Sequence, residues 1–399
     1  MGGRRFFECP MWIGVRFLPW MRVLARNRFR VTPARLPRAA AITAASLANE
    51  LLRGVTLAIW GRGMRAARLE ADPVVIIGHW RSGTTLLHEL LACDERFHAP
   101  TTLQCGAPSH FVLSEQFARD HLSFLLPEQR PMDGMPMGFD RPQEDEIALC
   151  NLGLPSPWWG VAFPNEPLPA DAYTDLESLS DRERARWLAT WTDFLRHVQF
   201  EHPGRLLLKN PLHTHRVPLI RSVYPQSDFI HISRDPHELV PSCLHFWRRM
   251  FESHGLQRAT AAGLEDQVFD SILRMDRRLA ATWDGIPEQR RFHARYEDLV
   301  ADPLGVLHAI YDHFGWPVAA VEPRWQASLA ERRDYRPNEH VTDERLARRI
   351  ATDLAEVLTR QGYSPRAAVE SSVANASRLE YAKAKPSSRV SRLESTRQG

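Results

Sequence analysis

The fold is decided by residues 73–85, whose sequence is PVVIIGHWRSGTT. Residues 74–77 are β-branched and are bounded by Pro73 and Gly78, which is typical of a short strand buried on both faces of a parallel sheet. The following residues turn through two glycines, and a helix is predicted over 84–92. A strand, a glycine-rich turn and a helix in this order surround an anion with backbone N–H groups and a helix N-terminus.

The spacing of Gly78 and Gly83 matches the ATP-binding P-loop, but Thr84 stands where that loop carries its lysine. Without the lysine the loop is poorly suited to a triphosphate held with Mg²⁺. Its charge comes from one arginine and its hydroxyl groups from a serine and two threonines, so we expect it to bind a less highly charged group without a metal. The residues expected to bind that group are Arg81, Ser82, Gly83, Thr84 and Thr85.

The same pattern of a short buried strand followed by a helix recurs along the chain. Further strands are predicted at 205–208, 228–232 and 291–296. Alternating strands and helices indicate an α/β protein, and we expect a three-layer, P-loop-like fold with a central parallel sheet. In such a sheet the ligands bind beyond the carboxyl ends of the strands.

A second anion site is predicted at residues 229–236, FIHISRDP. Arg234 follows a predicted strand, and Asp235 is expected to cap the next helix, with Glu238 at the capping-box position. Ser242 lies about two turns into that helix, from which its hydroxyl can join Arg234 on one phosphate.

Together the two motifs resemble those of the sulfotransferases that use 3′-phosphoadenosine-5′-phosphosulfate (PAPS). In that family an R/K-S-G-T-T loop binds the 5′-phosphosulfate, and a strand-end arginine with a serine eight residues later binds the 3′-phosphate. Residues 295–299, RYEDL, resemble the segment whose tyrosine lies by the adenine, which implies that role for Tyr296. The resemblance covers roughly residues 73–365, is closest to the bacterial-type branch, and implies PAPS as co-substrate with no metal. The family's late R-K-G element is not found, and the candidates to replace it are Arg332, Arg333 and Arg336.

Lys209 is the first of only three lysines among 51 Lys and Arg residues. It ends the predicted strand 205–208, and the resemblance places it in the donor site, where an ammonium can follow the oxygens of the transferring group as a mobile point charge. The other interpretation is a strand-end lysine paired with a carboxylate.

Two candidates for the general base remain open. His213 lies four residues after Lys209, and a neutral imidazole there can accept a hydroxyl or amine proton near pH 7. The alternative is a carboxylate of the acidic segment 144–146, with Glu144 as its first member, because some branches of the family use a glutamate base.

Composition sets the remaining expectations. The chain has 399 residues, 44% of them hydrophobic, as expected for a globular protein. We expect a basic, mainly helical N-terminal region over 1–72, a sulfotransferase domain over 73–365 and a disordered tail over 366–399. The odd number of cysteines, five, favours a reducing, cytoplasmic location.

Residues 1–69 contain thirteen arginines against Glu8 and Glu50, with interleaved aromatics. This pattern fits either a solvated basic helix or peripheral membrane contact through residues 1–40. The remainder of the chain is net negative, so no nucleic-acid partner is expected.

The predicted function is the transfer of a sulfuryl group from PAPS to a hydroxyl or amine of a small-molecule, carbohydrate or lipid acceptor. The alternatives are a non-catalytic nucleotide-binding or membrane-peripheral adaptor and a P-loop-type kinase, which Thr84 at the lysine position disfavours.

Overall fold

A computed structural model describes residues 11–126, 129, 134–166, 174–260, 262–332 and 342–364. The chain divides into two compact units, residues 1–340 and 341–399. The smaller unit contains helices α16 (Glu344–Asp353) and α17 (Ala355–Arg360). The tail predicted over 366–399 lies outside the described residues.

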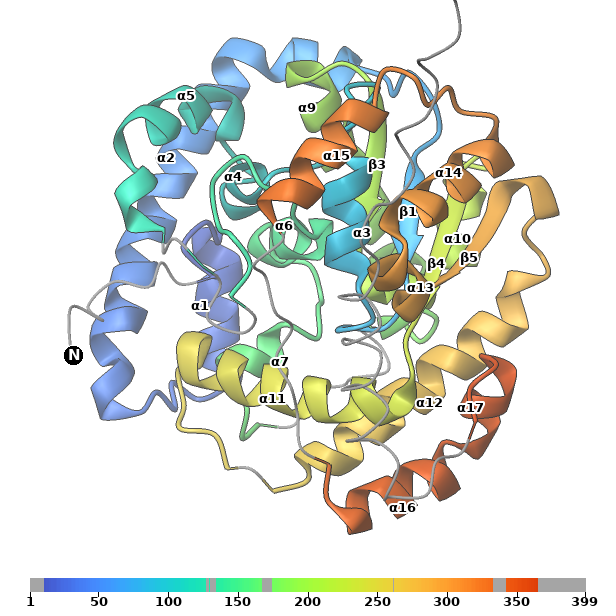
Figure 1. Cartoon of the computed structure of the whole chain (residues 1–399). Coiled ribbons are helices and arrows are strands. Elements are labelled where there is room, and N and C mark those ends of the chain that lie inside the picture. Colours follow the sequence, from blue (N-terminus) through green and yellow to red (C-terminus); the bar gives the residue numbers. More distant parts are fainter. Residues whose placement is uncertain are drawn as a thin grey trace, which may run out of the picture. The chain divides into compact units, whose positions relative to one another are not determined.

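The larger unit is built on a five-stranded parallel sheet in the order β2-β3-β1-β4-β5 (Figure 1). Its strands are β1 (Val74–Ile77), β2 (Phe97–His98), β3 (Arg205–Lys209), β4 (Asp228–Ser233) and β5 (Arg291–Arg295). β1 lies at the centre, with Val75 paired to Leu208 on one side and to Phe229 on the other. The four predicted strands are therefore confirmed. β2 was not predicted, because an edge strand of two residues carries no apolar run.

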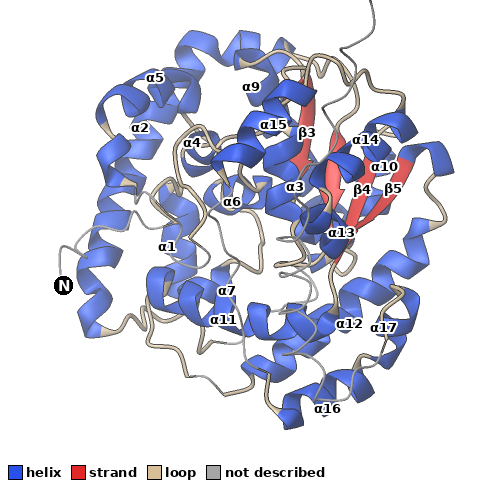
Figure 2. Cartoon of the chain, in the orientation of Figure 1, coloured by secondary structure: helices blue, strands red, loops and turns tan. Residues whose placement is uncertain are grey.

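The sheet separates two hydrophobic cores, as its alternating side chains require. One core contains Val75, Ile77, Leu206, Leu208 and Phe229. The other contains Val74, Ile76, Leu207, Ile230 and Ile232. Figure 2 shows helices on both sides of the strands. The predicted three-layer, P-loop-like fold with a central parallel sheet is confirmed.

Helices cover the sheet and extend beyond it. The helices before β3 are α1 (Phe17–Arg26), α2 (Leu36–Ala66), α3 (Thr84–Leu91), α4 (Thr102–Gly106), α5 (Phe111–His121), α6 (Asp145–Asn151), α7 (Trp159–Ala162) and α9 (Asp181–Glu201). The later helices of this unit are α10 (Val217–Val223), α11 (Pro236–His254), α12 (Leu264–Trp283), α13 (Tyr296–Ala301), α14 (Pro303–Phe314) and α15 (Glu322–Glu331). Short 3₁₀ helices are η1 (Pro33–Arg35), η2 (Ser123–Leu125), η3 (Pro211–Thr214) and η4 (Glu288–Arg290).

The N-terminal helices pack into the same compact unit as the sheet. α2 includes Pro37 in its first turn, where the missing N–H of a proline has no partner to lose. Trp20 Nε1 of α1 donates to Thr43 Oγ1 of α2 at 2.8 Å, which ties the two helices together. Among the described residues, no helix is long and apolar enough to cross a membrane.

Candidate active site

The loop between β1 and α3 has a backbone that only its glycines can adopt without strain. Gly83 has φ +98°, and a Cβ there would lie 2.4 Å from the Tyr296 ring. Gly78 has φ +145°, and a Cβ there would lie 2.4 Å from the carbonyl oxygen of Ile232. Arg81 also has a positive φ, +71°, a conformation that is uncommon for a side chain of its size.

Some of the residues predicted to bind an anion line a large cavity beside this loop, and others point into the protein. Gly83 is the N-cap of α3 and offers the first N–H groups of the helix no side-chain acceptor, which leaves that end suited to an anion. The backbone and side chains of Thr84 and Thr85 lie at this end and line the cavity. Ser82 points inward, because its hydroxyl donates to the carbonyl oxygen of His79 at 2.8 Å.

Arg234 lies beside the same loop, directly after β4. Its Nη1 donates to the carbonyl oxygen of Arg81 at 3.1 Å, and its guanidinium stacks over the Tyr296 ring at 4.6 Å. Its Nε is buried and has no hydrogen-bond partner among the described residues. The two predicted anion sites therefore meet, and Tyr296 contacts both of them.

Ser242 lies in α11 and is almost fully buried, with 2% of its surface exposed. Its hydroxyl accepts a hydrogen bond from Arg81 Nε at 3.2 Å, so in this structure it joins the arginine of the loop and not Arg234. Asp235 caps α11 by accepting from the N–H of His237, as predicted. The Asp235 N–H donates to Glu297 of α13, a contact that took the place of the capping box expected from Glu238.

Lys209, at the end of β3, forms an ion pair with Glu144. Its Nζ lies 2.7 Å from Glu144 Oε1, and the side chains are 2% and 12% exposed. The second carboxylate oxygen, Glu144 Oε2, is buried and has no hydrogen-bond partner among the described residues. The ammonium thus holds one oxygen of this carboxylate and leaves the other without a hydrogen-bond partner among the described residues.

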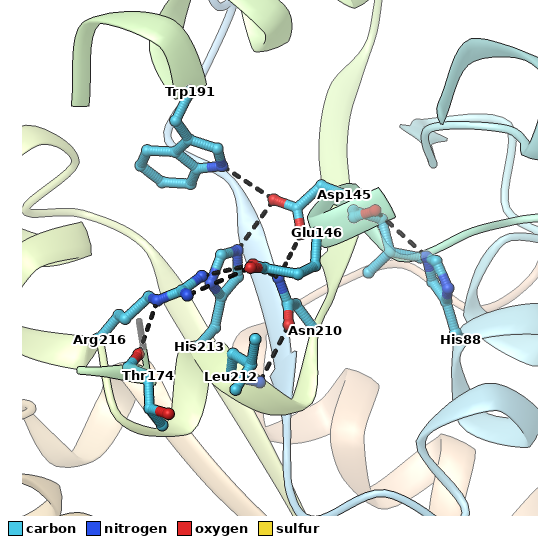
Figure 3. Close-up of polar contacts among 10 residues, drawn as sticks. His88, Asp145, Glu146, Thr174, Trp191, Asn210, Leu212, His213 and Arg216 are labelled. Atoms are coloured by element: carbon cyan, nitrogen blue, oxygen red, sulfur yellow. Dashed lines mark hydrogen bonds and ion pairs between the residues drawn. The ribbon is translucent and has the colours of Figure 1, made fainter. Parts of the chain in front are cut away.

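The two acidic residues that follow Glu144 belong to a buried network (Figure 3). Asp145 accepts from Trp191 Nε1 and Asn210 Nδ2 at 2.8 Å each, and Glu146 pairs with Arg216. Burial raises the pKa of Asp145, but the neighbouring His213 and the hydrogen bonds outweigh it, so the pKa stays below its usual range. These contacts fix the N-terminus of α6 and with it the position of Glu144.

His213 belongs to this network and not to the surface of the cavity. Its side chain is 0% exposed, and its Nε2 lies 2.9 Å from Asp145 Oδ2 (Figure 3). The histidine predicted as a candidate base therefore does not line the cavity in this structure.

A cavity of about 1270 Å³ lies next to these groups. Its wall includes seven of the predicted residues: Arg81, Gly83, Thr84, Thr85, Glu144, Arg234 and Tyr296. Ser82, Lys209, His213 and Ser242 lie behind this wall. Arg332 also lines the cavity, where it pairs with Glu89.

Much of the cavity wall comes from helices that the sequence analysis did not connect with the site. Residues of α2 and α5, among them Ala48, Leu52 and Leu113, form an apolar part of it, together with Trp80 and Met135. Their apolar character was visible in the sequence, but no motif indicated that the N-terminal helices reach the active site.

Comparisons with known proteins agree with this arrangement. A model of the sulfotransferase family matches residues 73–320. The omega-hydroxy-beta-dihydromenaquinone-9 sulfotransferase Stf3 of Mycobacterium bovis is 38% identical over 360 residues, which are 90% of this chain and 92% of that protein. The Stf3 protein of Mycobacterium tuberculosis matches to the same extent.

Two solved structures share the fold. Sulfotransferase STF9 from Mycobacterium avium has a TM-score of 0.64 and 21% identity, covering 87% of this chain and 92% of its own. Sulfotransferase STF1 from Mycobacterium tuberculosis has a TM-score of 0.54 and 18% identity, covering 78% and 85%. The family match over the sheet domain and the long alignment with Stf3 lead to one conclusion: this chain is an enzyme of the sulfotransferase family.

Proposed function

We propose that this sulfotransferase moves the sulfuryl group of PAPS to a hydroxyl group of an apolar, lipid-like acceptor. The observation that carries the proposal is the juxtaposition of two features in one cavity. One end holds the anion-binding loop, Arg234 and the available oxygen of Glu144, and the remaining wall is largely apolar.

The residues at the loop fit a bisphosphorylated nucleotide. The start of α3 and the Arg81 side chain would hold the 5′-phosphosulfate, and the unpartnered Nε of Arg234 suits the 3′-phosphate. Tyr296, stacked against Arg234, would lie against the adenine. PAPS supplies an activated sulfuryl group, and the chain's own residues then have to orient the acceptor and accept its proton.

Glu144 is the general base in this proposal. A base must lie within hydrogen-bond reach of the proton that it accepts, and Glu144 lines the cavity with Oε2 unpartnered among the described residues. His213 does not line the cavity, because its side chain is 0% exposed and its Nε2 is held by Asp145. Of the two candidates, we therefore propose the carboxylate of Glu144 as the base.

Lys209 has a separate role. Its ammonium holds Glu144 Oε1 at 2.7 Å, which fixes the position of this carboxylate. The ammonium would also stabilise the negative charge that develops on the leaving phosphate oxygen. The sequence suggested a carboxylate pair as the alternative to a catalytic role for Lys209. The ion pair with Glu144 is compatible with that catalytic role.

The acceptor is proposed from the shape and polarity of the cavity. A volume of about 1270 Å³ with apolar residues from α2 and α5 is suited to a long apolar molecule rather than to a sugar, which needs many polar partners. The relative Stf3 is named for an omega-hydroxylated menaquinone, a lipid with a terminal hydroxyl. We therefore place a lipid alcohol ahead of amines and carbohydrates.

We propose that the protein is located in the cytoplasm. The described cysteines, Cys93, Cys105, Cys150 and Cys243, are all free thiols, which is usual in a reducing compartment.

The experiment combines transfer and binding. Purified enzyme is incubated with radiolabelled PAPS and matched panels of lipid alcohols, sugars and amines, and calorimetry compares 3′-phosphoadenosine-5′-phosphate with ATP and Mg²⁺. We expect label in a lipid alcohol and tight binding of the bisphosphate. Tight binding of ATP alone would contradict the donor, and label only in sugars or amines would contradict the acceptor. Bisphosphate binding with no transfer to any acceptor would favour a non-catalytic adaptor.

A further inference from the structure

The outward face of α2 is apolar along its length. Every exposed residue between 33 and 61 is apolar. Four of the five large ones, Leu47, Leu51, Val55 and Ile59, are spaced by four residues and therefore form one stripe, here called the α2 stripe. Leu51 is 75% exposed and Ile59 is 59% exposed.

The inward face of α2 is mixed, because the apolar Ile42 and Met64 are buried beside the polar Ser46 and Asn49. The polar groups have partners there: Asn49 Nδ2 donates to the carbonyl oxygens of Ile13 and Val15, and the Ser46 hydroxyl donates to the Thr43 carbonyl oxygen within the helix. A helix that only covered a globular core would have its apolar side inward. An exposed apolar stripe of more than three turns is typical of a surface that binds a partner.

Positive charges lie at both ends of the α2 stripe. Exposed Arg28 and Arg30 precede the helix with the 57% exposed Phe29 between them, and exposed Arg62 and Arg65 follow the stripe. The one acidic residue from 9 to 69, Glu50, is paired with Arg16 at 3.0 Å. A second copy of this face would bring arginines against arginines, whereas an anionic surface complements them.

The cavity is continuous with this face. Ala48 of α2 is exposed and also lines the cavity, and so does Phe117 of α5, which is 58% exposed. α5 packs beside α2, as Figure 1 shows. Phe124, which is 76% exposed, precedes the cavity-lining Leu125. The exposed apolar surface and the apolar cavity wall thus share the same two helices.

We propose that the α2 stripe, flanked by its arginines, lies on the surface of an anionic lipid bilayer. The helix binds in the plane of the interface, with its apolar face among the headgroups and upper acyl chains. The acceptor then passes between α2 and α5 from the bilayer into the cavity, a step that rests on the proposed function. The bilayer contact extends from residue 33 to 62 and is centred on α2, beyond the region 1–40 expected from composition.

The test is co-sedimentation of the full chain with vesicles of phosphatidylcholine alone or mixed with phosphatidylglycerol. We expect binding to the anionic vesicles that weakens with salt. Leu51→Glu/Ile59→Glu should lower the partition coefficient by more than about tenfold, because two charges would enter the acyl region. Ala281→Glu/Ala320→Glu, which adds the same charges at exposed alanines outside this face, is the matched control and should bind normally.

A second pair of variants tests the arginines. Arg28→Glu/Arg62→Glu should lower binding to anionic vesicles by about tenfold or more, since each basic residue at the surface adds to the attraction. Arg182→Glu/Arg186→Glu on α9 makes the same change of charge and should have little effect. Circular dichroism and the affinity for 3′-phosphoadenosine-5′-phosphate verify that all variants are folded.

Three results would overturn the proposal: no sedimentation of the wild type with anionic vesicles, equal sedimentation of Leu51→Glu/Ile59→Glu, or a wild-type dimer that these substitutions dissociate without any vesicle binding. Sedimentation requires neither donor nor acceptor, so its failure would leave the proposed function standing. Conversely, vesicle binding without transfer would support the membrane surface and count against the proposed function alone.

Discussion

At the scale of single residues, three adjacent carboxylates have three different environments. Glu144 lines the cavity and pairs with Lys209, whereas Asp145 and Glu146 are buried and bonded to Asn210 and Arg216. The sequence could predict that a carboxylate of this segment was a candidate base. The sequence could not distinguish the three carboxylates, because their environments depend on partner residues 46 to 70 positions away in the sequence. Only the fold brings these partners close.

Lys209→Arg should lower turnover by about two orders of magnitude. The site around Nζ is closed, with the side chain 2% exposed and Glu144 at 2.7 Å, so the longer and planar guanidinium cannot occupy the same position. Steady-state kinetics measures the loss, and the affinity for 3′-phosphoadenosine-5′-phosphate shows whether the fold is retained. A fully active Lys209→Arg variant would show that the reaction does not require a lysine at this position.

His213→Ala should mainly destabilise the protein. It leaves Asp145 buried without one of its partners, which costs about 1–3 kcal/mol of unfolding free energy. Denaturant unfolding measures this loss. In the folded fraction we expect kcat within about tenfold of the wild type, whereas a loss of about three orders of magnitude there would return the role of base to the histidine.

At the scale of elements, the turn between β1 and α3 is the part of the site that the sequence predicted best. The motifs correctly indicated the positions of three features: the two glycines with positive φ, the start of α3 and the arginine after β4. Local motifs succeed here because short-range backbone geometry determines them. The α2 wall of the cavity was not predictable in this way, because its outward apolar face has the composition of an ordinary buried helix.

Gly83→Ala tests the turn. The new Cβ would lie 2.4 Å from the Tyr296 ring at a φ of +98°, so the loop and the ring must move apart, and we expect the affinity for 3′-phosphoadenosine-5′-phosphate to fall by about tenfold or more. Gly315→Ala is the matched control, since it has φ +67° and nothing within 4 Å of the new Cβ. Both variants place a Cβ at positive φ, which costs about 1–3 kcal/mol of stability, and an equal affinity in both would contradict the contact with Tyr296.

At the scale of the whole molecule, buried histidines make stability depend on pH. Burial lowers the pKa of His79 to about 4, and burial with the nearby Lys209 charge lowers that of His88 to about 3. The unfolded state therefore takes up protons near pH 6.5 that the folded state does not bind, so the unfolding free energy falls as the pH decreases below 6.5.

Each of these two histidines should remove about 2 kcal/mol of unfolding free energy between pH 7 and pH 5. Denaturant unfolding at a series of pH values measures the slope. His88→Gln should reduce it, whereas the same change at the exposed His121 should not. A stability that is constant between pH 7 and pH 5 would show that the buried imidazoles are protonated in the folded state.

The central claim is that the unpartnered oxygen of Glu144 accepts the acceptor's proton. It is tested most directly by the single-turnover rate of sulfuryl transfer from bound PAPS in the Glu144→Gln enzyme, which keeps the shape of the side chain and removes its basicity. We predict a rate lower by about 10²–10⁴ with unchanged affinity for 3′-phosphoadenosine-5′-phosphate. A rate within a factor of about three of the wild type would contradict it.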